Sequence, residues 1–140
     1  MKVSELAKKL DVTADTVRYY TRIGCLDPVK SSTNGYKHYG QNDQDRLRFI
    51  LNARQLGFSV NDISKILEET AKGNTGCPLA REILDQRLKE TEDLFQRTLA
   101  LRNRMYSALQ EWESKPDEIP TDRMVCHLIE GLDGPELRGS

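Results

Sequence analysis

Three cysteines and two histidines are the residues of this chain best suited to bind a soft metal ion. Cys126 and His127 are adjacent near the end of the chain, and Cys77 and Cys25 lie far earlier. Thiolates and an imidazole form a soft to borderline donor set, which suits zinc, cadmium, mercury or lead and disfavours magnesium and calcium. An odd number of widely spaced cysteines does not indicate a disulfide framework, so we expect free thiols in a reducing, cytoplasmic setting.

The composition is that of a soluble globular protein with one or two small domains. Of its 140 residues, 37% are hydrophobic and 31% are charged, which favours long exposed helices. No apolar run reaches the length of a membrane span, and the N-terminus lacks the apolar segment of a signal peptide. Residues 1–60 carry 10 Lys and Arg against 6 Asp and Glu, whereas residues 61–140 carry 11 against 16. This asymmetry suits a nucleic-acid-binding head on an acidic body.

The first 24 residues have the pattern of a helix-turn-helix. Residues 3–10 place apolar side chains at helical spacing, with Ser4 as the expected N-cap. A second helix is expected from Thr13, which can cap it, to Gly24, which can end it. Val17 and Ile23 should face inward, which leaves an outward set made of Thr16, Arg18, Tyr20 and Arg22.

The segments after this motif predict a wing and two more helices. Asn34-Gly35 is a strong hairpin-turn signal between two short β-prone stretches. An amphipathic helix is expected from Asn42 to Gly57, and another over residues 60–70. A glycine-rich break then precedes Cys77 and Pro78.

Residues 78–112 contain no internal proline or glycine and predict one helix roughly 50 Å long. Its apolar positions follow a 4-3-4-3 spacing, at Leu84, Leu88, Thr91, Phe95, Thr98, Arg102, Met105, Leu109 and Trp112. A head of about 70 residues cannot cover such a helix, so a coiled coil with a second copy is the expected solution. The alternative is a helix that folds back on its own domain. A proline-rich loop and a short terminal helix or turn should follow.

This order of elements, together with the strings "RYY…G…P…GY…Y" and "LGFS…I", resembles the MerR family of bacterial transcription regulators. The tail, with a cysteine, a long helix, a second cysteine and "LIE", is similar to the heavy-metal branch of that family. The resemblance implies a mainly α fold with a winged helix-turn-helix head, a long antiparallel coiled-coil dimerisation helix, and a C-terminal metal-binding loop with a short helix. The implied boundaries are 1–72 for the head, 73–113 for linker and dimerisation helix, 114–131 for the metal-binding part and 132–140 for a disordered tail.

The resemblance also implies the function and partners. A regulator of this kind is not an enzyme; it binds a promoter with an over-long spacer as a homodimer. When its ligand binds, it distorts the DNA so that RNA polymerase can use the promoter. The expected DNA-binding residues are Thr13, Thr16, Arg18, Tyr19, Tyr20, Arg22, Lys30, Tyr36, Lys37, His38, Tyr39 and Arg54. Of the two adjacent tyrosines, Tyr20 is favoured for DNA and Tyr19 for the core. The alternatives are solvated charges and a wing whose tyrosines pack on the head.

In an antiparallel pair of long helices, the start of one meets the end of the other. Cys77 of one subunit would then approach Cys126 and His127 of its partner, and these three are the expected ligands. Glu118, Asp133 or water could complete the site. The family's zinc, mercury and lead sensors carry a further cysteine near the end of the long helix, where this chain reads "EWESK". The metal is therefore left open, Cys25 is expected to be structural, and a sensor of oxidants or thiol-reactive compounds is the alternative function.

Overall fold

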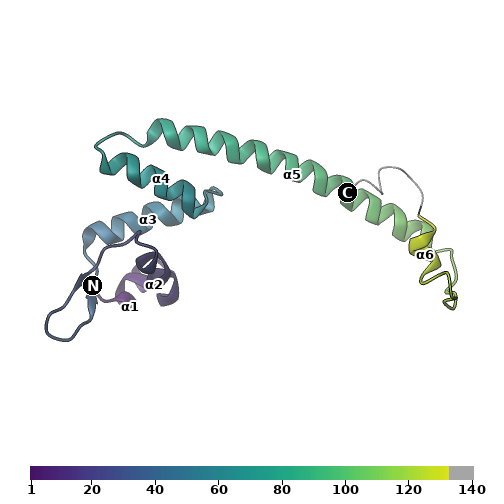
Figure 1. Ribbon diagram of the computed structural model, residues 1–140, viewed down its shortest axis with the longest axis horizontal. Helices are drawn as coiled ribbons and strands as arrows, with labels where there is room; N and C mark the ends of the chain where they lie inside the picture. Colours follow the sequence, from purple (N-terminus) through teal and green to yellow (C-terminus); the bar gives the residue numbers. More distant parts are fainter. Residues whose placement is uncertain (133–140) are drawn as a thin grey trace. The chain divides into compact units, whose positions relative to one another are not determined.

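The structure, a computed structural model, describes residues 1–132 of the chain and is mainly helical (Figure 1). Its elements in chain order are α1 (Val3–Lys9), α2 (Ala14–Arg22), β1 (Val29–Lys30), β2 (Lys37–His38), α3 (Gln41–Gln55), α4 (Val60–Ala71), α5 (Cys77–Trp112) and α6 (His127–Glu130). These confirm the expected order of helix-turn-helix, wing, two helices, long helix and short terminal helix. The tail expected over residues 132–140 lies outside the described residues from position 133 onward.

The chain divides into two compact units. The first comprises Met1–Leu88, and the second begins at Lys89. Helix α5 therefore starts in the first unit, which we call the head, and continues through the second, which we call the rod.

The core of the head forms because α1 and α2 each place apolar side chains on one face. Leu6 and Val17 are completely buried, and Leu47 and Ile50 of α3 complete the same cluster. The Thr13 side chain accepts a hydrogen bond of 3.1 Å from the amide of Thr16, so it caps α2 as predicted. At the other end of α2, Gly24 has a φ of +87°, the left-handed conformation that ends a helix.

Two details of the helix-turn-helix differ from the sequence-based expectation. Lys2 rather than Ser4 is the N-cap residue of α1, because the helix begins one residue before the expected cap. Ile23 follows the end of α2 and is 40% exposed, so the prediction that it faces inward was wrong.

The wing is a short antiparallel ribbon in which Val29 pairs with His38 and Lys30 pairs with Lys37. Gly35 takes a φ of +75° in the turn, as the Asn-Gly pair predicts, and the Asn34 side chain accepts a hydrogen bond of 3.0 Å from the amide of Tyr36. After β2 the chain returns to the head, where the Tyr39 amide donates to the Met1 carbonyl at 2.7 Å.

The first turns of α5 pack on the head. Ile83 is the one buried residue of α5 within the described chain, and Leu79 and Ala80 are partly buried beside the same cluster. The Arg87 Nε lies 3.3 Å from the Asp62 carboxylate at the start of α4. Gly76 precedes the helix where a Cβ would approach the Ile66 side chain to 3.0 Å, so a larger residue there would require Ile66 to shift.

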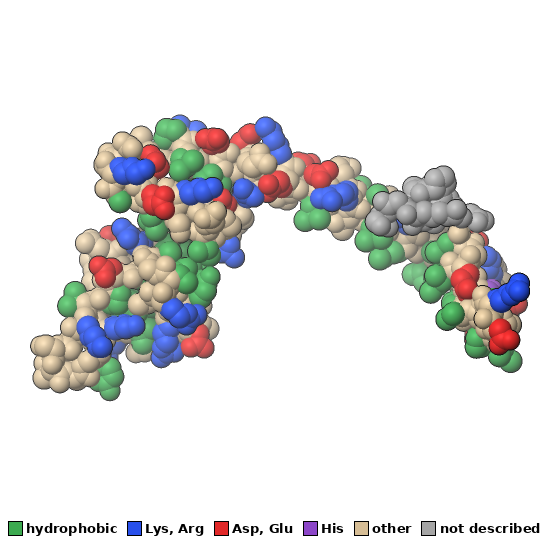
Figure 2. Space-filling view, in the orientation of Figure 1, with side chains coloured by type: hydrophobic (Ala, Val, Ile, Leu, Met, Phe, Trp, Pro, Cys, Tyr) green, Lys and Arg blue, Asp and Glu red, His purple; other side chains and the backbone are tan. Residues whose placement is uncertain are grey.

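Beyond Leu88 the long helix carries large apolar side chains that nothing in the described chain covers. They are Leu94 (58% exposed), Phe95 (60%), Leu99 (41%), Leu101 (44%), Met105 (57%), Tyr106 (55%) and Leu109 (62%). At 3.6 residues per turn, most of these positions fall on one side of the helix. Figure 2 shows hydrophobic side chains gathered along one edge of α5.

Candidate functional site

The outward face of α2 is the candidate DNA-recognition surface of the head. Thr13, Arg18, Tyr19 and Arg22 are exposed, and Thr16 is half-buried. The Arg22 guanidinium lies 5.6 Å from the centre of the Tyr19 ring, a cation–π arrangement, and Arg18 pairs with Asp15 at 2.9 Å. The surface therefore presents two arginines and an aromatic hydroxyl, which suit phosphate oxygens and base edges.

Two of the tyrosines expected to face DNA are in the core instead. Tyr20 is 7% exposed, whereas its neighbour Tyr19 is 38% exposed, so the prediction that Tyr20 points outward and Tyr19 packs in the core was wrong. Tyr20 follows Val17 by three positions and shares its buried face. Tyr39 is 2% exposed, and its hydroxyl lies 2.7 Å from the Thr21 hydroxyl, which agrees with the alternative that a wing tyrosine packs on the head rather than faces DNA.

The other wing residues keep the exposed positions that DNA contacts require. Lys30, Tyr36, Lys37 and His38 are exposed, and Lys30 and Lys37 are directly opposite in the ribbon. Like charges at opposite positions of an antiparallel pair destabilise it. The ribbon therefore concentrates two positive charges at one exposed place.

Arg54 has a structural contact that the sequence did not reveal. Its Nη1 donates a hydrogen bond of 2.8 Å to the Phe58 carbonyl, in the bend that follows α3. A guanidinium has five donors, so this bond leaves others for a phosphate.

The cysteines occupy three different environments. Cys25 is buried, and burial raises the pKa of its thiol while the nearby Arg46 charge lowers it less, so the net shift is upward. Cys77 is exposed at the first position of α5, and Cys126 is half-buried directly before α6. The structural role expected for Cys25 agrees with its burial, and the other two thiols are more accessible to a metal or reagent.

Both ring nitrogens of His127, the expected histidine ligand, contact residues of the loop before it. Nδ1 of His127 lies 2.8 Å from the Glu118 carboxylate, and its Nε2 lies 2.8 Å from the Pro116 carbonyl oxygen. A metal bound at His127 must therefore displace one of these two partners. Glu118, considered as a ligand, is thus beside His127, whereas Asp133 lies outside the described residues.

Within residues 1–132, no three His, Cys, Asp or Glu side chains of a single chain come together as a metal-binding group. The chemistry of Cys77, Cys126 and His127 still fits a soft metal, because two thiolates and an imidazole are its preferred donors. A second carboxylate orders the same loop, since Glu130 accepts hydrogen bonds from the amides of Val125 (3.0 Å) and Cys126 (2.7 Å).

Sequence reasoning missed the link between Asp62 and Arg87. Asp62 is 5% exposed, and its carboxylate accepts a hydrogen bond of 2.9 Å from the Ser59 amide while the Ser59 hydroxyl accepts one of 3.0 Å from the Asp62 amide. The spacing Ser59-x-x-Asp62 resembles a capping box and could have predicted this part. The approach of Arg87 depends on how α5 packs, which no local pattern specifies.

Comparison with known proteins agrees with this architecture. The family model "MerR HTH family regulatory protein" matches residues 1–70, and "MerR, DNA binding" matches residues 44–108. The mercuric resistance operon regulatory protein of Bacillus cereus is 32% identical over 131 residues, covering 94% of this chain and 96% of that protein. The transcriptional regulator ZntR of Escherichia coli K12 is 30% identical over 133 residues, covering 94% and 92%.

Solved structures agree at the level of the fold. The lead(II) complex of the regulator PbrR691 from Ralstonia metallidurans CH34 aligns with a TM-score of 0.72 at 22% identity, covering 95% of this chain and 99% of that one. No helix within the described residues is both long and apolar enough to cross a membrane. The matched families and relatives are regulators rather than enzymes, as predicted. The chain belongs to the MerR family of helix-turn-helix transcription regulators.

Proposed function

We propose that this regulator is a homodimer that activates transcription when a soft or borderline metal ion binds between its subunits. It binds a double-stranded promoter with a long spacer and acts together with RNA polymerase. Its proposed location is the cytoplasm. The functional parts are the winged helix-turn-helix DNA-binding domain (1–72), the linker and dimerisation helix (73–113) and the metal-binding loop and short helix (114–131). The names of the relatives concerned with mercuric resistance and of the lead(II) complex support a metal response.

The exposed apolar side of α5 is the observation that carries this proposal. Helix α5 has 36 residues, and its side chains from Leu94 to Leu109 remain largely exposed in the described chain. Contiguous apolar surface of this kind marks an interface rather than a solvated helix. A second copy offers the same stripe, so two rods can bury it against each other in a coiled coil.

An antiparallel arrangement of the two rods would bring cysteines of different subunits close to each other. Cys77 is the first residue of α5, and Cys126 lies after the end of α5, beyond the loop of residues 113–125. Antiparallel pairing brings Cys77 of one subunit toward Cys126 of the other. The bound metal would supply strong bonds between the two subunits, which can change how the two heads are held.

The residues proposed to hold the ion are Cys77, Cys126 and His127, with zinc, cadmium, mercury and lead as candidates. His127 would exchange its Pro116 or Glu118 partner for the metal. Thiols at Cys77 and Cys126 bind as thiolates, so they release protons when the ion enters.

The DNA contacts proposed for the head are the exposed members of the predicted set. These are the exposed residues Thr13, Arg18, Tyr19, Arg22, Lys30, Tyr36, Lys37, His38 and Arg54, together with the half-buried Thr16. Contacts with phosphates position a protein and let it hold DNA in a bent or untwisted form. Residues 1–60 have a net positive charge, which supports this role.

One observation favours a second candidate function. Cys77 is exposed, Cys126 is half-buried, and both ring nitrogens of His127 already have partners. Two accessible thiols without a third donor also suit a sensor of oxidants or thiol-reactive compounds.

A metal panel on the promoter complex separates these functions. Zinc, cadmium, mercury and lead are added to the protein on a long-spacer promoter, and run-off transcript and thiolate-to-metal absorption are measured together. The metal proposal predicts both signals for at least one ion, and their loss in Cys77→Ser and in Cys126→Ser but not in Cys25→Ser. Transcript induced by an oxidant alone, with no absorption band for any ion, would replace it with the thiol-sensor function.

A further inference from the structure

The imidazole ring of His127 is held at both of its nitrogen atoms by the loop between α5 and α6. Figure 1 shows this loop and α6 at the far end of α5. Nδ1 lies 2.8 Å from the Glu118 carboxylate, and Nε2 lies 2.8 Å from the Pro116 carbonyl oxygen. The side chain of His127 is only 21% exposed. The ring therefore has one defined orientation before any ion arrives.

The two partners of the ring differ in charge. Glu118 offers a carboxylate, whereas Pro116 offers a neutral carbonyl oxygen. Both are acceptors, so the ring donates from each nitrogen in this arrangement. A hydrogen bond to an ionised group is roughly twice as strong as one between neutral groups. Lys115, which is close in sequence, pairs with Glu111 at 2.9 Å and so is engaged elsewhere. The bond to Pro116 is therefore the easier one to exchange for a metal ion.

We propose that Glu118 is a positioning residue, which keeps its hydrogen bond to Nδ1 of His127 while Nε2 leaves Pro116 and binds the soft ion. Histidines that bind metals usually donate their other ring N–H to a carboxylate or carbonyl, which fixes the ring and makes it a stronger ligand. Nε2 releases its hydrogen to solvent as a proton when it binds. The inference rests on the proposed metal-dependent function. It assigns Nε2 as the ligand atom and removes Glu118 from the candidate ligands.

A second carboxylate positions the neighbouring ligand in the same way. Glu130 accepts hydrogen bonds from the backbone amides of Val125 at 3.0 Å and Cys126 at 2.7 Å. One carboxylate thus orders the peptide that carries the thiol, and the other orders the imidazole of His127. A single chain therefore presents two of the three proposed donors in an ordered segment, and Cys77 of the second subunit completes the set. Donors that are already ordered lower the cost of binding.

The exposure of Glu118 separates this role from a role in folding. The Glu118 side chain is 52% exposed. An ion pair with so exposed a member contributes little to stability. Removal of Glu118 should therefore leave the protein folded and dimeric, and its effect should appear in metal affinity.

Cadmium affinity of the full-length dimer is the first test. Cadmium is titrated in competition with a chelator, and thiolate-to-cadmium absorption is measured for wild type, Glu118→Ala and the control Asp117→Ala. Glu118→Ala should bind cadmium about 10- to 100-fold more weakly, as expected when the partner of a metal-binding histidine is removed. Asp117→Ala removes the same charge from the adjacent position of the loop and should retain the wild-type affinity. Circular dichroism and sedimentation check the fold and the dimer.

Glu118→Gln distinguishes a positioning residue from a ligand. The glutamine side chain keeps an oxygen that can accept from Nδ1, so this variant should recover most of the lost affinity. A neutral carboxamide does not replace a carboxylate as a ligand of the ion. Affinity as low as that of Glu118→Ala would therefore make Glu118 a ligand and overturn the proposal. An equal loss in Asp117→Ala would overturn it as well, because only the charge of the loop would then matter.

Nitrogen NMR of the cadmium-loaded protein locates the bound atom. The chain has two histidines, so the signals of His127 are assigned by their loss in His127→Ala. The proposal predicts a metal-bound Nε2 and a hydrogen on Nδ1, in wild type and in Glu118→Gln. A metal-bound Nδ1, or equal cadmium affinity of wild type and Glu118→Ala, would overturn this inference alone. Failure of wild type to bind cadmium, zinc, mercury or lead would refute the proposed function and this inference with it.

Discussion

The head and the rod of this protein differ in whether their large apolar side chains are buried within the single chain. In the head, Leu6, Val17 and Leu47 are completely buried by helices of the same chain. In the rod, Leu94 and Met105 are 58% and 57% exposed. The head is therefore complete as a single chain, whereas the rod has an unfilled surface that a second copy can cover. We infer that the head folds stably within one chain and that the rod forms the dimer on which regulation depends.

The largest effect should follow from charges placed on the apolar side of the rod. Leu94→Asp/Met105→Asp should convert the dimer to a monomer, with the dissociation constant raised at least about a thousandfold, because buried carboxylates oppose association strongly. Sedimentation measures the assembly. Gln96→Asp/Ser107→Asp adds the same charge on the other side of the helix and should leave the dimer intact. A dimeric Leu94→Asp/Met105→Asp protein would place the interface elsewhere.

The core of the head gives the next effect. Leu47→Ala removes a completely buried side chain and should lower the free energy of unfolding of the head by about 2–5 kcal/mol. Urea unfolding measures it, on a dimeric sample with sedimentation as a check. Leu99→Ala in the rod should act instead on the dissociation constant. If both substitutions changed only dimer assembly, the distinction between the two regions would be wrong.

A smaller effect is expected within the head, where the start of α5 contacts α4 through Asp62 and Arg87. Burial alone would raise the pKa of the Asp62 carboxyl. The hydrogen bonds from Ser59 and the charges of Arg87 and Lys65 together outweigh this effect, so the pKa of Asp62 lies below its ordinary value. Asp62→Ala should cost about 2–4 kcal/mol at neutral pH. A lowered pKa stabilises the folded state above the unfolded value, about 3.9, and this contribution is lost as the pH falls through the folded value.

Unfolding of wild type, Asp62→Ala and the exposed-carboxylate control Asp45→Ala should therefore be compared from neutral pH to about pH 3. The deficit of Asp62→Ala should be constant above about pH 5 and shrink below about pH 4. If the loss of unfolding free energy in Asp62→Ala did not change with pH, the charge of Asp62 would contribute nothing to its contact with Arg87.

The smallest effect concerns Cys25. Its buried thiol should react far more slowly with a thiol reagent than Cys77 or Cys126, as counted by mass spectrometry of the native protein. Cys25→Ala should cost about 1 kcal/mol of stability and leave metal absorption unchanged. Labelling of Cys25 as fast as the other two would contradict its assignment to the core.

Most of the fold followed from local sequence. Thr13 as a cap and Asn34-Gly35 in a turn depend on a few neighbouring residues, and the long helix depends on the absence of internal proline and glycine; all three are confirmed. Tyr19 and Tyr20 could not be separated in the same way. Both are large and adjacent, and which one is buried depends on the rotation of α2 against its neighbours.

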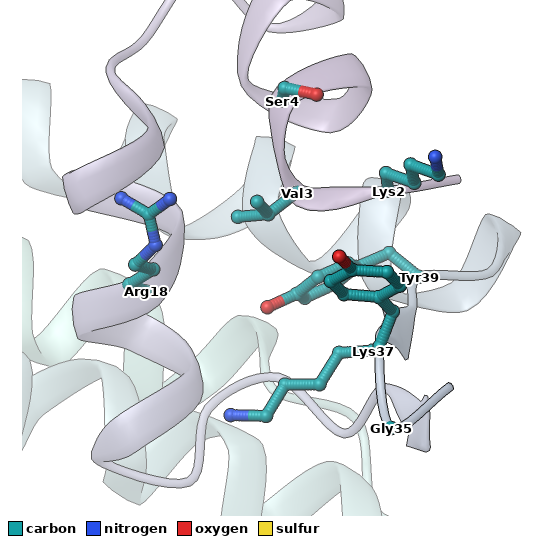
Figure 3. Close-up of a pocket in the computed structure, with 8 residues that line it drawn as sticks. Lys2, Val3, Ser4, Arg18, Gly35, Lys37 and Tyr39 are labelled. Carbon is teal, nitrogen blue, oxygen red and sulfur yellow. The ribbon is translucent and has the colours of Figure 1, made fainter. Parts of the chain in front are cut away.

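The candidate sites show the same limit. Lys2, Arg18 and Lys37 each lie in an ordinary local sequence, and only the fold brings these three separate segments to one pocket of the head (Figure 3). The contacts of His127 with Glu118 and Pro116 likewise depend on the path of the tail loop. Sequence therefore indicated which residues could bind metal or DNA but not which partners they meet.

The central claim, that Cys77 and Cys126 of different subunits share an ion, is tested most directly by mixing two inactive variants. Cys77→Ser and Cys126→Ser homodimers are exchanged to form heterodimers, and thiolate-to-metal absorption is titrated. A site across subunits predicts recovery of the band at one ion per heterodimer, because one of its two sites regains both cysteines. Absence of any recovery in purified heterodimers, with wild type still binding metal, would contradict the account.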